Sequence, residues 1–368
     1  MDFSAILLLV GGFVLLVFGA EVLVRGASRL AVMFGISPLV IGLTVVSFGT
    51  SSPEIAVSVQ SSFAGQADLA LGNVVGSNIA NILLVLGASA IAAPLTVSIQ
   101  LVRLDVPLMI GVSILLLLLG LDGNLSLIDG VVLFLGVVGY TSFLVIQSRK
   151  QSKAEQEAAN EEYGIDEQES AMQRWLINPG FIVIGLVMLV FGSDLLVDGA
   201  IIIAKAFGVS EFVIGLTIVA VGTSLPELAT SVVASLRGER DIAVGNAVGS
   251  NLFNILLVLG VSSIIAPGGL TVTDAAIHFD IPIMIGVALL CMPIFFNGIV
   301  ARWEGLFFLV LYASYVMELY FSTTSHPLFP LYNEFLMKGL LPVTTLLLIF
   351  VTVRALRLMR QKASQKST

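Results

Sequence analysis

Long apolar segments, separated by short polar turns, recur from one end of the chain to the other. Each holds about 20 residues with few charges, enough for a helix to cross the roughly 30 Å hydrocarbon core of a bilayer. The pattern predicts eleven membrane-spanning helices, at residues 4–24, 37–62, 69–93, 104–121, 126–147, 178–200, 211–236, 242–266, 279–297, 303–321 and 339–357. We therefore expect an all-α polytopic membrane protein.

The composition supports this fold class. Of the 368 residues, 57% are hydrophobic and 11% are charged, and the mean hydropathy is +1.04. Soluble chains carry about 25% charged residues, so the composition excludes a soluble enzyme, a nucleic-acid binder and a disordered chain. We expect a multi-pass protein of the cell (inner or plasma) membrane, surrounded by the lipid bilayer and without a nucleic-acid partner.

Basic residues indicate the orientation of the helices, because Lys and Arg concentrate on the cytoplasmic side of a membrane. With the N-terminus outside, about 15 of the 17 basic residues fall on the cytoplasmic side, and only Lys205 and Lys338 fall outside. The reverse orientation would violate the rule almost everywhere. We therefore expect the N-terminus outside the cell and the C-terminus inside.

The chain contains an internal repeat. A shift of about 173 residues aligns 42–94 with 215–267 without a gap, and about 33 of the 53 paired positions are identical. Each copy holds five predicted spans, an odd number, so the second copy crosses the membrane in the opposite sense. Inverted repeats are typical of secondary transporters, which bind their substrate near the midplane between the repeats.

The repeat predicts ten transmembrane helices in two inverted halves, with the eleventh as a C-terminal addition. The halves are 1–147 and 178–321, joined by an acidic cytoplasmic linker at 148–177, and 322–368 holds the extra helix and a basic tail. The linker could sense a regulatory cation or serve only as a solvated connector. It lacks the spacing of acidic residues that a calcium loop needs.

The second and the seventh predicted spans each contain one glutamate near the middle, at matching places in the two copies. An ionised carboxylate at this depth is costly unless it is paired or coordinated. No Lys or Arg lies at comparable depth in the repeat spans. Glu54 and Glu227 therefore indicate a bound cation, a proton, or both.

Helix breakers and polar side chains accompany each glutamate. Pro53 and Pro226 directly precede the glutamates and predict helix breaks that free the carbonyls of Gly49 and Gly222. Hydroxyls and amides follow at helical spacing: Thr50, Ser51, Asn73, Ser77 and Asn81 in the first copy, and Thr223, Ser224, Asn246, Ser250 and Asn254 in the second. Taken alone, the Asn and Ser stripes are as typical of contacts between helices as of ion ligands. The neighbouring glycines are expected to allow close packing: Gly72, Gly76, Gly245 and Gly249.

The donor set favours a hard cation. Ca²⁺ takes six to eight oxygen ligands at about 2.3–2.6 Å, and two carboxylates balance one divalent or two monovalent ions. A soft metal is not expected, because His278 and His326 fall outside the polar centre and Cys291 is alone. We expect transported ions and no cofactor.

At these residues the sequence resembles the cation/Ca²⁺ exchanger superfamily, in particular its prokaryotic Na⁺/Ca²⁺-exchanger-like branch. The signature motifs of the two repeats stand here as GTSSPE (49–54) with GNVVGSNIAN (72–81), and as GTSLPE (222–227) with GNAVGSNLFN (245–254). The resemblance covers ten of the eleven spans. It implies a secondary antiporter, not an enzyme, that exchanges Ca²⁺ for Na⁺ by alternating access.

The resemblance also implies roles for individual residues. By position, the Ca²⁺ ligands would be Thr50, Glu54, Thr223 and Glu227. Na⁺ or another coupling ion would be held by Ser51, Ser77, Asn81, Ser224, Ser250 and Asn254, with backbone carbonyls near Ser47 and Ala220. Both central polar positions are Asn here, whereas some relatives have Asp in one repeat, so a third carboxylate is missing and the coupling ion stays open.

Three other functions have to be compared with this one. A Ca²⁺/H⁺ or other cation/H⁺ antiporter would use the same fold, with Glu54 or Glu227 cycling a proton. An intramembrane hydrolase needs a nucleophile–base pair or two catalytic Asp, and no His lies beside a candidate Ser. A cation channel relies on symmetric rings or a filter, whereas this chain has one inverted pair. We expect a monomer whose substrates are Ca²⁺ and Na⁺ (or H⁺).

Overall fold

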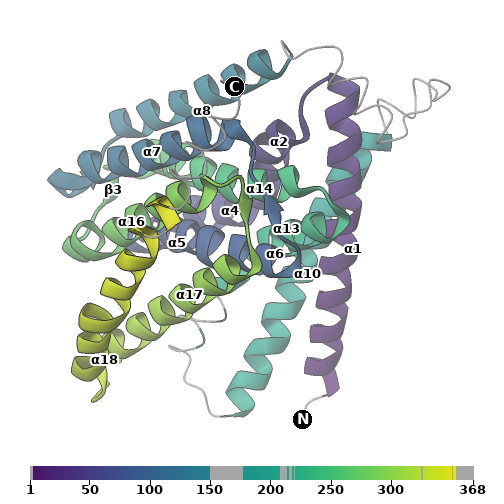
Figure 1. Ribbon diagram of the computed structural model, residues 1–368. Coiled ribbons are helices and arrows are strands. Elements are labelled where there is room, and N and C mark those ends of the chain that lie inside the picture. The colour runs from purple at the N-terminus through teal and green to yellow at the C-terminus, as the bar shows by residue number, and fades with distance from the viewer. Residues whose placement is uncertain are drawn as a thin grey trace.

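The computed structural model describes residues 3–149, 177–207, 220–324, 326–349 and 351–353, together with Ile214 and Ile218. The linker predicted at 148–177 lies outside these residues except at 148, 149 and 177, and so does the tail after 353. The described part is a bundle of helices in which the two longest, α1 (Phe3–Phe34) and α10 (Asn178–Ala206), run side by side (Figure 1).

The two halves have matching element orders. After α1, the first half contains α2 (Pro38–Ile41), η1 (Gly42–Val46), α3 (Ser47–Thr50), α4 (Ser52–Phe63), α5 (Ala67–Ala80), η2 (Asn81–Leu86), α6 (Gly87–Ala92), β1 (Leu95–Thr96), η3 (Leu101–Asp105), α7 (Val106–Leu119), η4 (Gly120–Asp122), β2 (Asn124–Leu125) and α8 (Leu127–Ser148). After α10, the second half and the C-terminal addition contain α12 (Ala220–Gly222), α13 (Leu225–Arg237), α14 (Arg240–Phe253), η7 (Asn254–Leu259), α15 (Gly260–Ile265), β3 (Leu270–Thr271), η8 (Ala276–Asp280), α16 (Ile281–Phe295), β4 (Ile299–Val300), α17 (Arg302–Thr323), α18 (Phe329–Phe335) and η9 (Leu336–Leu340).

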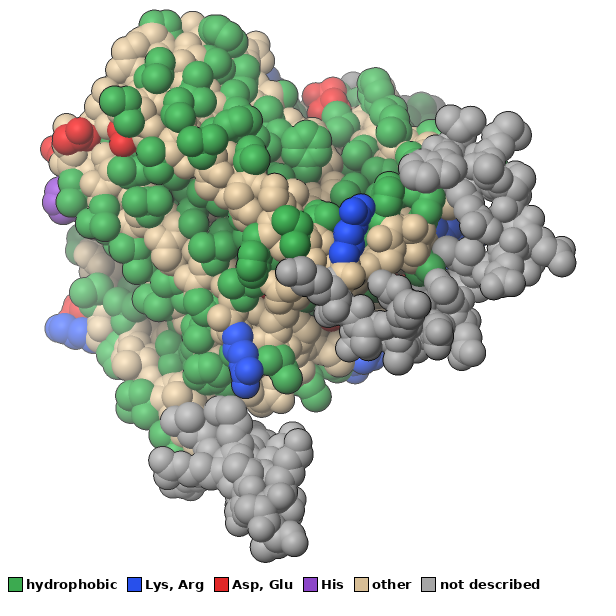
Figure 2. All heavy atoms as spheres, turned by 90° about the horizontal axis from the view of Figure 1, so that it is seen from above, with side chains coloured by type: hydrophobic (Ala, Val, Ile, Leu, Met, Phe, Trp, Pro, Cys, Tyr) green, Lys and Arg blue, Asp and Glu red, His purple; other side chains and the backbone are tan. Residues whose placement is uncertain are grey.

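The predicted all-α membrane fold is confirmed. Nine helices among the described residues are long and apolar enough to cross a membrane, and a bent pair, Pro38–Thr50 with Ser52–Phe63, makes a tenth span with a bend of 47°. These match ten of the eleven predicted segments, and the remaining one, 211–236, is described only in part. Figure 2 shows an outer face dominated by hydrophobic side chains, as contact with lipid requires.

The last span begins earlier than the sequence predicted. Its helix starts at Phe329 and not at 339, because the helix continues through the charged residues Glu334 and Lys338. Glu334 and Lys338 lie one turn apart and form an ion pair of 2.6 Å, which offsets their charges. The ninth predicted segment is likewise continuous: Pro282 lies in the first turn of α16, where a missing N–H costs no helical hydrogen bond, and Pro293 lies inside the helix.

The third span of each half forms the centre of the bundle. In Ala67–Ala92 and in Arg240–Ile265, 78% of the most apolar window is buried, against at most 39% in the seven other unbroken spans among the described residues. Both central helices contain a π-helical turn that begins at the matching asparagine, Asn81 or Asn254. Such turns widen a helix locally and are frequent at functional sites. The other unbroken spans surround this centre and expose apolar faces, whereas the bent span is largely buried beside it.

Glycines at intervals of seven residues bring α1 and α10 into backbone contact. A Cβ atom at Gly12 would lie 2.6 Å from the nitrogen of Leu196, and one at Gly192 would lie 2.8 Å from the nitrogen of Leu16. The full set, which we call the glycine seam, is Gly12, Gly19, Gly26, Gly185, Gly192 and Gly199. Small residues allow such approach between membrane helices.

Two very short antiparallel ribbons join the halves. The sequence analysis predicted only helices and did not include these ribbons. β1 pairs with β4, and β2 pairs with β3, so each ribbon takes one strand from each half. The ribbons lie in the turns between spans, where backbone groups need partners outside a helix.

The two ends of the bundle are packed differently. At the end where α13 terminates, α1 packs along α13, and Glu21 accepts a hydrogen bond of 2.7 Å from Nε of Arg237. At the end where α4 terminates, the corresponding helices α10 and α4 do not pack along each other within their described residues. The counterparts of Glu21 and Arg237 there are Asp194 and Ala64, which cannot form this ion pair.

A serine pair repeats this difference. Ser235 of α13 donates to the carbonyls of Ser89 (2.9 Å) and Ala93 (3.2 Å) in the other half. Its counterpart Ser62 donates to Ser58 of its own helix at 2.6 Å. The α13 end is therefore tied to neighbouring elements by side-chain contacts that the α4 end does not repeat among the described residues.

Candidate ion-binding site

Both glutamates lie in the first turn of a helix that follows a break. α3 ends at Thr50 and α4 begins at Ser52, while α12 ends at Gly222 and α13 begins at Leu225. The prolines therefore lie in a first turn, where proline is tolerated, and the break precedes them by two residues. A carboxylate in the first turn interacts favourably with the helix dipole, so the local sequence places each glutamate at a helix start within the membrane.

Both carbonyls predicted to be freed by the breaks have a partner, and that of Gly49 accepts a backbone N–H at the end of α3. The hydroxyl of Ser193 on α10 donates to the carbonyl of Gly222 at 2.7 Å. The counterpart of Ser193 in the first half is Ala20, which has no hydroxyl to offer Gly49. The break in the second half is therefore linked to α10 by a side-chain hydrogen bond that the first half cannot form.

The two glutamates are fully buried and lie close together. Each has an exposed fraction of 0%, and the carboxylates are near enough to repel one another. One oxygen of each accepts a hydroxyl: Ser77 donates to Oε1 of Glu54 at 3.2 Å, and Ser51 donates to Oε1 of Glu227 at 3.1 Å. Among the described residues no basic side chain pairs with either carboxylate.

The breaks of the two halves interlock. Ser51 of the first half bonds Glu227 of the second, and Thr50 also faces Glu227. Thr223 of the second half faces Glu54 of the first. Thr50 in addition donates to Oδ1 of Asn246 at 3.1 Å. Each glutamate is therefore surrounded by hydroxyls from both halves.

Several buried oxygens around the glutamates have no hydrogen-bond partner among the described residues. They are Oε2 of Glu54, Oε2 of Glu227, Oγ1 of Thr223, Oγ of Ser224, Oγ of Ser250, Oδ1 of Asn81 and Oδ1 of Asn254. A buried polar atom left without a partner costs about 1–3 kcal/mol. Such a set of carboxylate and neutral oxygens fits a hard cation as cargo, and these seven oxygens belong to predicted site residues; Oγ1 of Thr230 and Oδ1 of Asn251 also lack a partner among the described residues.

The outer asparagines of the predicted stripes link helices. Asn73 donates to the hydroxyl of Ser58 (2.9 Å) and to the carbonyl of Glu54 (3.3 Å). Asn246 makes the same pair of contacts with Ser231 (2.9 Å) and with the carbonyl of Glu227 (3.4 Å). Both asparagines therefore hold the glutamate helix against the central helix, as the helix-contact interpretation expects.

Glycines of the second motif pack as predicted. A Cβ atom at Gly245 would lie 2.9 Å from the carbonyl oxygen of Leu39, and one at Gly249 would lie 2.6 Å from that of Leu43. The segment that the repeat would place against Gly72 and Gly76 lies outside the described residues.

Sequence reasoning named Ser47 only for its carbonyl, and it missed the Ser47 hydroxyl and two asparagines next to the polar centre. Ser47 is fully buried and donates to the carbonyls of Gly42 (2.7 Å) and Asn246 (3.1 Å). The side-chain amide of Asn78 joins the two central helices, because it donates to the backbone carbonyl of Asn251 and accepts from Asn254, while the amide of Asn251 contacts Met109 of α7. Both asparagines occur at the same place of the GSN tripeptide in the two copies, so the repeat itself was a signal for them.

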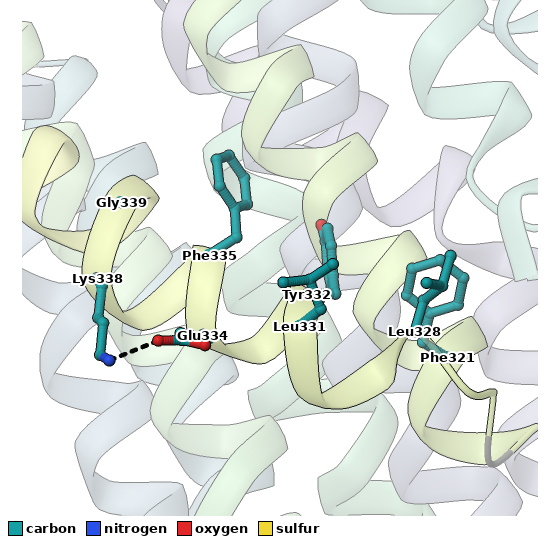
Figure 3. A pocket seen from close by; sticks show the side chains of 8 residues that line it. All are labelled: Phe321, Leu328, Leu331, Tyr332, Glu334, Phe335, Lys338 and Gly339. Atoms are coloured by element: carbon teal, nitrogen blue, oxygen red, sulfur yellow. Dashed lines mark hydrogen bonds and ion pairs between the residues drawn. The ribbon is translucent and has the colours of Figure 1, made fainter.

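Other polar features lie elsewhere. Asp105 is buried and accepts hydrogen bonds from Tyr140 (3.0 Å) and Gln100 (3.2 Å), which satisfies it locally. A groove of about 660 Å³ between α17 and α18 has mainly apolar walls and the Glu334–Lys338 ion pair (Figure 3). Its described lining offers no unpaired carboxylate, so it does not resemble the cation centre.

The soft donors lie outside the polar centre. His278 faces the carbonyl of Asp274 (3.0 Å) and is exposed, and His326 stacks on Phe321. Cys291 is buried within α16. Among the described residues, no group of three or more His, Cys, Asp or Glu side chains could hold a metal ion.

These features define a class: a transporter of inverted repeats with two opposed, buried glutamates. The family model described as sodium/calcium exchanger protein matches residues 4–147 and 177–321, which are the two halves. The chain belongs to this family.

Individual relatives agree with the family match. The sodium/calcium exchanger MaX1 of Methanosarcina acetivorans is 32% identical over 346 residues, which cover 86% of this chain and 98% of the relative. The inner membrane protein YrbG of Escherichia coli is 40% identical over 289 residues, covering 77% and 87%.

A solved structure has the same fold. The sodium-calcium exchanger NCX_Mj, soaked without Na⁺ and Ca²⁺, superposes with a TM-score of 0.73 at 32% identity, covering 87% of this chain and 100% of that one. The protein is therefore a multi-pass cell-membrane transporter of the cation/Ca²⁺ antiporter type, and its family is one of exchangers, not of enzymes.

Proposed function

We propose that the protein exchanges Ca²⁺ for Na⁺ across the membrane by alternating access. The observation that carries this proposal is the pair of buried glutamates surrounded by oxygens without partners. The names of MaX1 and NCX_Mj support the choice of ions, since both are called sodium/calcium exchangers. Another crystal of NCX_Mj was soaked with Na⁺ and Sr²⁺, an ion with chemistry close to that of Ca²⁺.

Each site residue has a role in this proposal. Ca²⁺ is held by Thr50, Glu54, Thr223 and Glu227. Na⁺ is held beside it by Ser51, Ser77, Asn81, Ser224, Ser250 and Asn254. The contacts of Ser77 with Glu54 and of Ser51 with Glu227 support this division, because they keep one oxygen of each carboxylate engaged and leave the other for cations.

Coupling follows from the charge of the site. Two carboxylates without a basic partner are costly at membrane depth, so the halves do not rearrange around them unless cations neutralise the charge. One Ca²⁺, or Na⁺ ions in its place, provides that neutralisation. Exchange is then favoured over one-way leakage.

Transport in proteoliposomes tests the function. A Na⁺ gradient is expected to drive radiolabelled Ca²⁺ flux, and Glu54→Gln or Glu227→Gln is expected to reduce the flux to below about a tenth, because ligand charge sets Ca²⁺ affinity. Glu334→Gln is the matched control, since Glu334 is exposed and forms an ion pair with Lys338, outside the polar centre. Full flux in both site variants would refute the assignment.

A second candidate is Ca²⁺/H⁺ or other cation/H⁺ exchange on the same fold. The presence of Asn at both 81 and 254 is the observation in favour of this candidate. A site with two carboxylates neutralises fewer bound cations than a site with three, so fewer Na⁺ ions would bind in exchange for Ca²⁺. Flux that a pH gradient drives in the absence of Na⁺ would support this candidate. Flux that requires Na⁺ at every pH would exclude it.

We also propose an orientation with the N-terminus outside and the C-terminus inside, on the distribution of basic residues. The α13 end of the bundle is then cytoplasmic, and the α4 end faces outward. Single cysteines placed in the linker and in the 205 turn, in a Cys291→Ser chain, should react with impermeant thiol reagents from opposite sides. Labelling of both from the same side would contradict the proposal.

A further inference from the structure

Two asparagines lie where the central helices of the two halves meet. Asn78 donates from Nδ2 to the backbone carbonyl of Asn251 (3.3 Å) and to the sulfur of Met284 (3.5 Å). Its amide nitrogen is thereby committed to acceptors, so Oδ1 is the atom left to accept. Asn254 donates to that oxygen from Nδ2 at 3.1 Å. Asn78 and Asn254 are 2% and 0% exposed, so the contact is shielded from solvent.

The contact determines which end of the Asn254 amide is free. An amide that uses its nitrogen as a donor presents its oxygen on the other side. Oδ1 of Asn254 is buried and has no partner among the described residues, and it is one of the oxygens of the ion-binding centre. Asn78 therefore presents Asn254 as a carbonyl ligand.

The pseudo-symmetric contact is missing. Asn251 donates from Nδ2 to the sulfur of Met109 (3.4 Å), but its Oδ1 has no partner in the described part of the chain. Both amide atoms of Asn81, the counterpart of Asn254, also lack partners there. Of the two GSN tripeptides, only the first therefore contacts an ion-site asparagine of the other half among the described residues.

We propose that Asn78 is a positioning residue that orients Asn254 as a carbonyl ligand of the coupling ion, while Asn81 is left free to turn. This inference rests on the proposed function. It predicts that Asn78 and Asn251, which are equivalent in the repeat, contribute unequally to Na⁺ affinity.

Asn78→Leu and Asn251→Leu form a matched pair for the test. Without its acceptor, the Asn254 amide turns and can present its NH₂ group to a cation. Apparent Na⁺ affinity is expected to fall about 2- to 10-fold in Asn78→Leu, the size of one hydrogen bond. Apparent Ca²⁺ affinity should stay within about twofold, because Asn254 is not among the Ca²⁺ ligands, and Asn251→Leu should leave Na⁺ affinity within the same factor.

Two measurements separate the possible failures. Na⁺ and Ca²⁺ affinities are read from flux and, independently, from the rise in unfolding temperature that each ion produces in purified protein. If the wild-type chain responds to neither ion, the proposed function fails. If the wild type responds and the two Leu variants change Na⁺ affinity equally, the positioning role of Asn78 is refuted.

A milder pair covers the case in which the Leu variants do not fold. Met284→Leu and Met109→Leu keep volume and remove only the sulfur acceptor, and such exchanges are well tolerated. Met284→Leu is expected to weaken Na⁺ binding about twofold or less, since the Asn251 carbonyl still holds Asn78. Met109→Leu should have no effect, and an equal loss in both would overturn the proposal.

Discussion

Individual hydroxyls have unequal partners although the repeat makes them equivalent. Ser51 bonds the carboxylate of Glu227, whereas Ser224 has no partner among the described residues. Ser77 bonds Glu54, whereas Ser250 faces Glu227 without such a hydrogen bond among the described residues. The first half therefore supplies the hydroxyls that hydrogen-bond the carboxylates, and Ser224 and Ser250 of the second half are left free for cations.

This difference predicts separate effects on stability. Ser51→Ala should lower the unfolding free energy of the cation-free protein by about 1.5–3 kcal/mol, because a hydrogen bond to a charged group is lost. Ser224→Ala should leave that free energy nearly unchanged and reduce the stabilisation that Na⁺ gives. Thermal unfolding of purified protein with and without Na⁺ measures both, and equal effects in the two variants would contradict the division.

At the scale of elements, the seam between α1 and α10 allows these two helices to lie in backbone contact. Its glycines recur every seven residues, which keeps them on one face of each helix. Sequence analysis predicted both helices as spans and did not predict that they pair, since a glycine spacing does not identify its partner.

Gly192→Ala should disrupt this seam. Its Cβ atom would lie 2.8 Å from the backbone nitrogen of Leu16 and 3.0 Å from the carbonyl oxygen of Gly12, and backbone atoms cannot turn away. We expect a loss of about 1–3 kcal/mol, as for other overpacked sites. The control Gly11→Ala has no atom within 4 Å of its Cβ and should change stability by about 1 kcal/mol at most. Thermal unfolding of the two variants compares them, and similar losses would refute the packing role.

The helix breaks were predictable and their contacts were not. Proline before a mid-span glutamate indicates a break from local stereochemistry alone. The partner of each glutamate comes from the opposite half, about 173 residues away in the chain, and depends on how the halves dock. Local sequence contains no information on that docking beyond the repeat.

At the scale of the whole molecule, the two ends of the bundle are unequal. The α13 end is held by the Glu21–Arg237 ion pair and by Ser235, and the α4 end repeats neither contact among the described residues. In the proposed cycle these contacts would hold the α13 end closed. In the proposed cycle the molecule must also open there, which requires α1 to leave α13.

Arg237→Gln should make opening at the α13 end more frequent. The ion pair is partly exposed, with 57% of the Arg237 side chain accessible, so its contribution is at most about 1 kcal/mol. A Thr230→Cys reporter in a Cys291→Ser chain, buried on the same helix, should then react up to about fivefold faster with an impermeant thiol reagent. Arg302→Gln, an exposed charge at the start of α17, is the control, and an unchanged rate in Arg237→Gln would refute the role of the contact.

The sequence alone determined the number and place of most spans, the inverted repeat and the ten candidate site residues. These properties are local or periodic: hydropathy depends on one segment at a time, and a repeat is visible by comparing the chain with itself. Only the tertiary structure decided which hydroxyl meets which carboxylate, that Asn78 and not Asn251 accepts a hydrogen bond from a site asparagine of the other half among the described residues, and that the two ends differ in their side-chain contacts. Two copies with the same motifs make different contacts because each copy packs against the other and not against itself, so symmetry in the sequence does not require symmetry in the folded molecule.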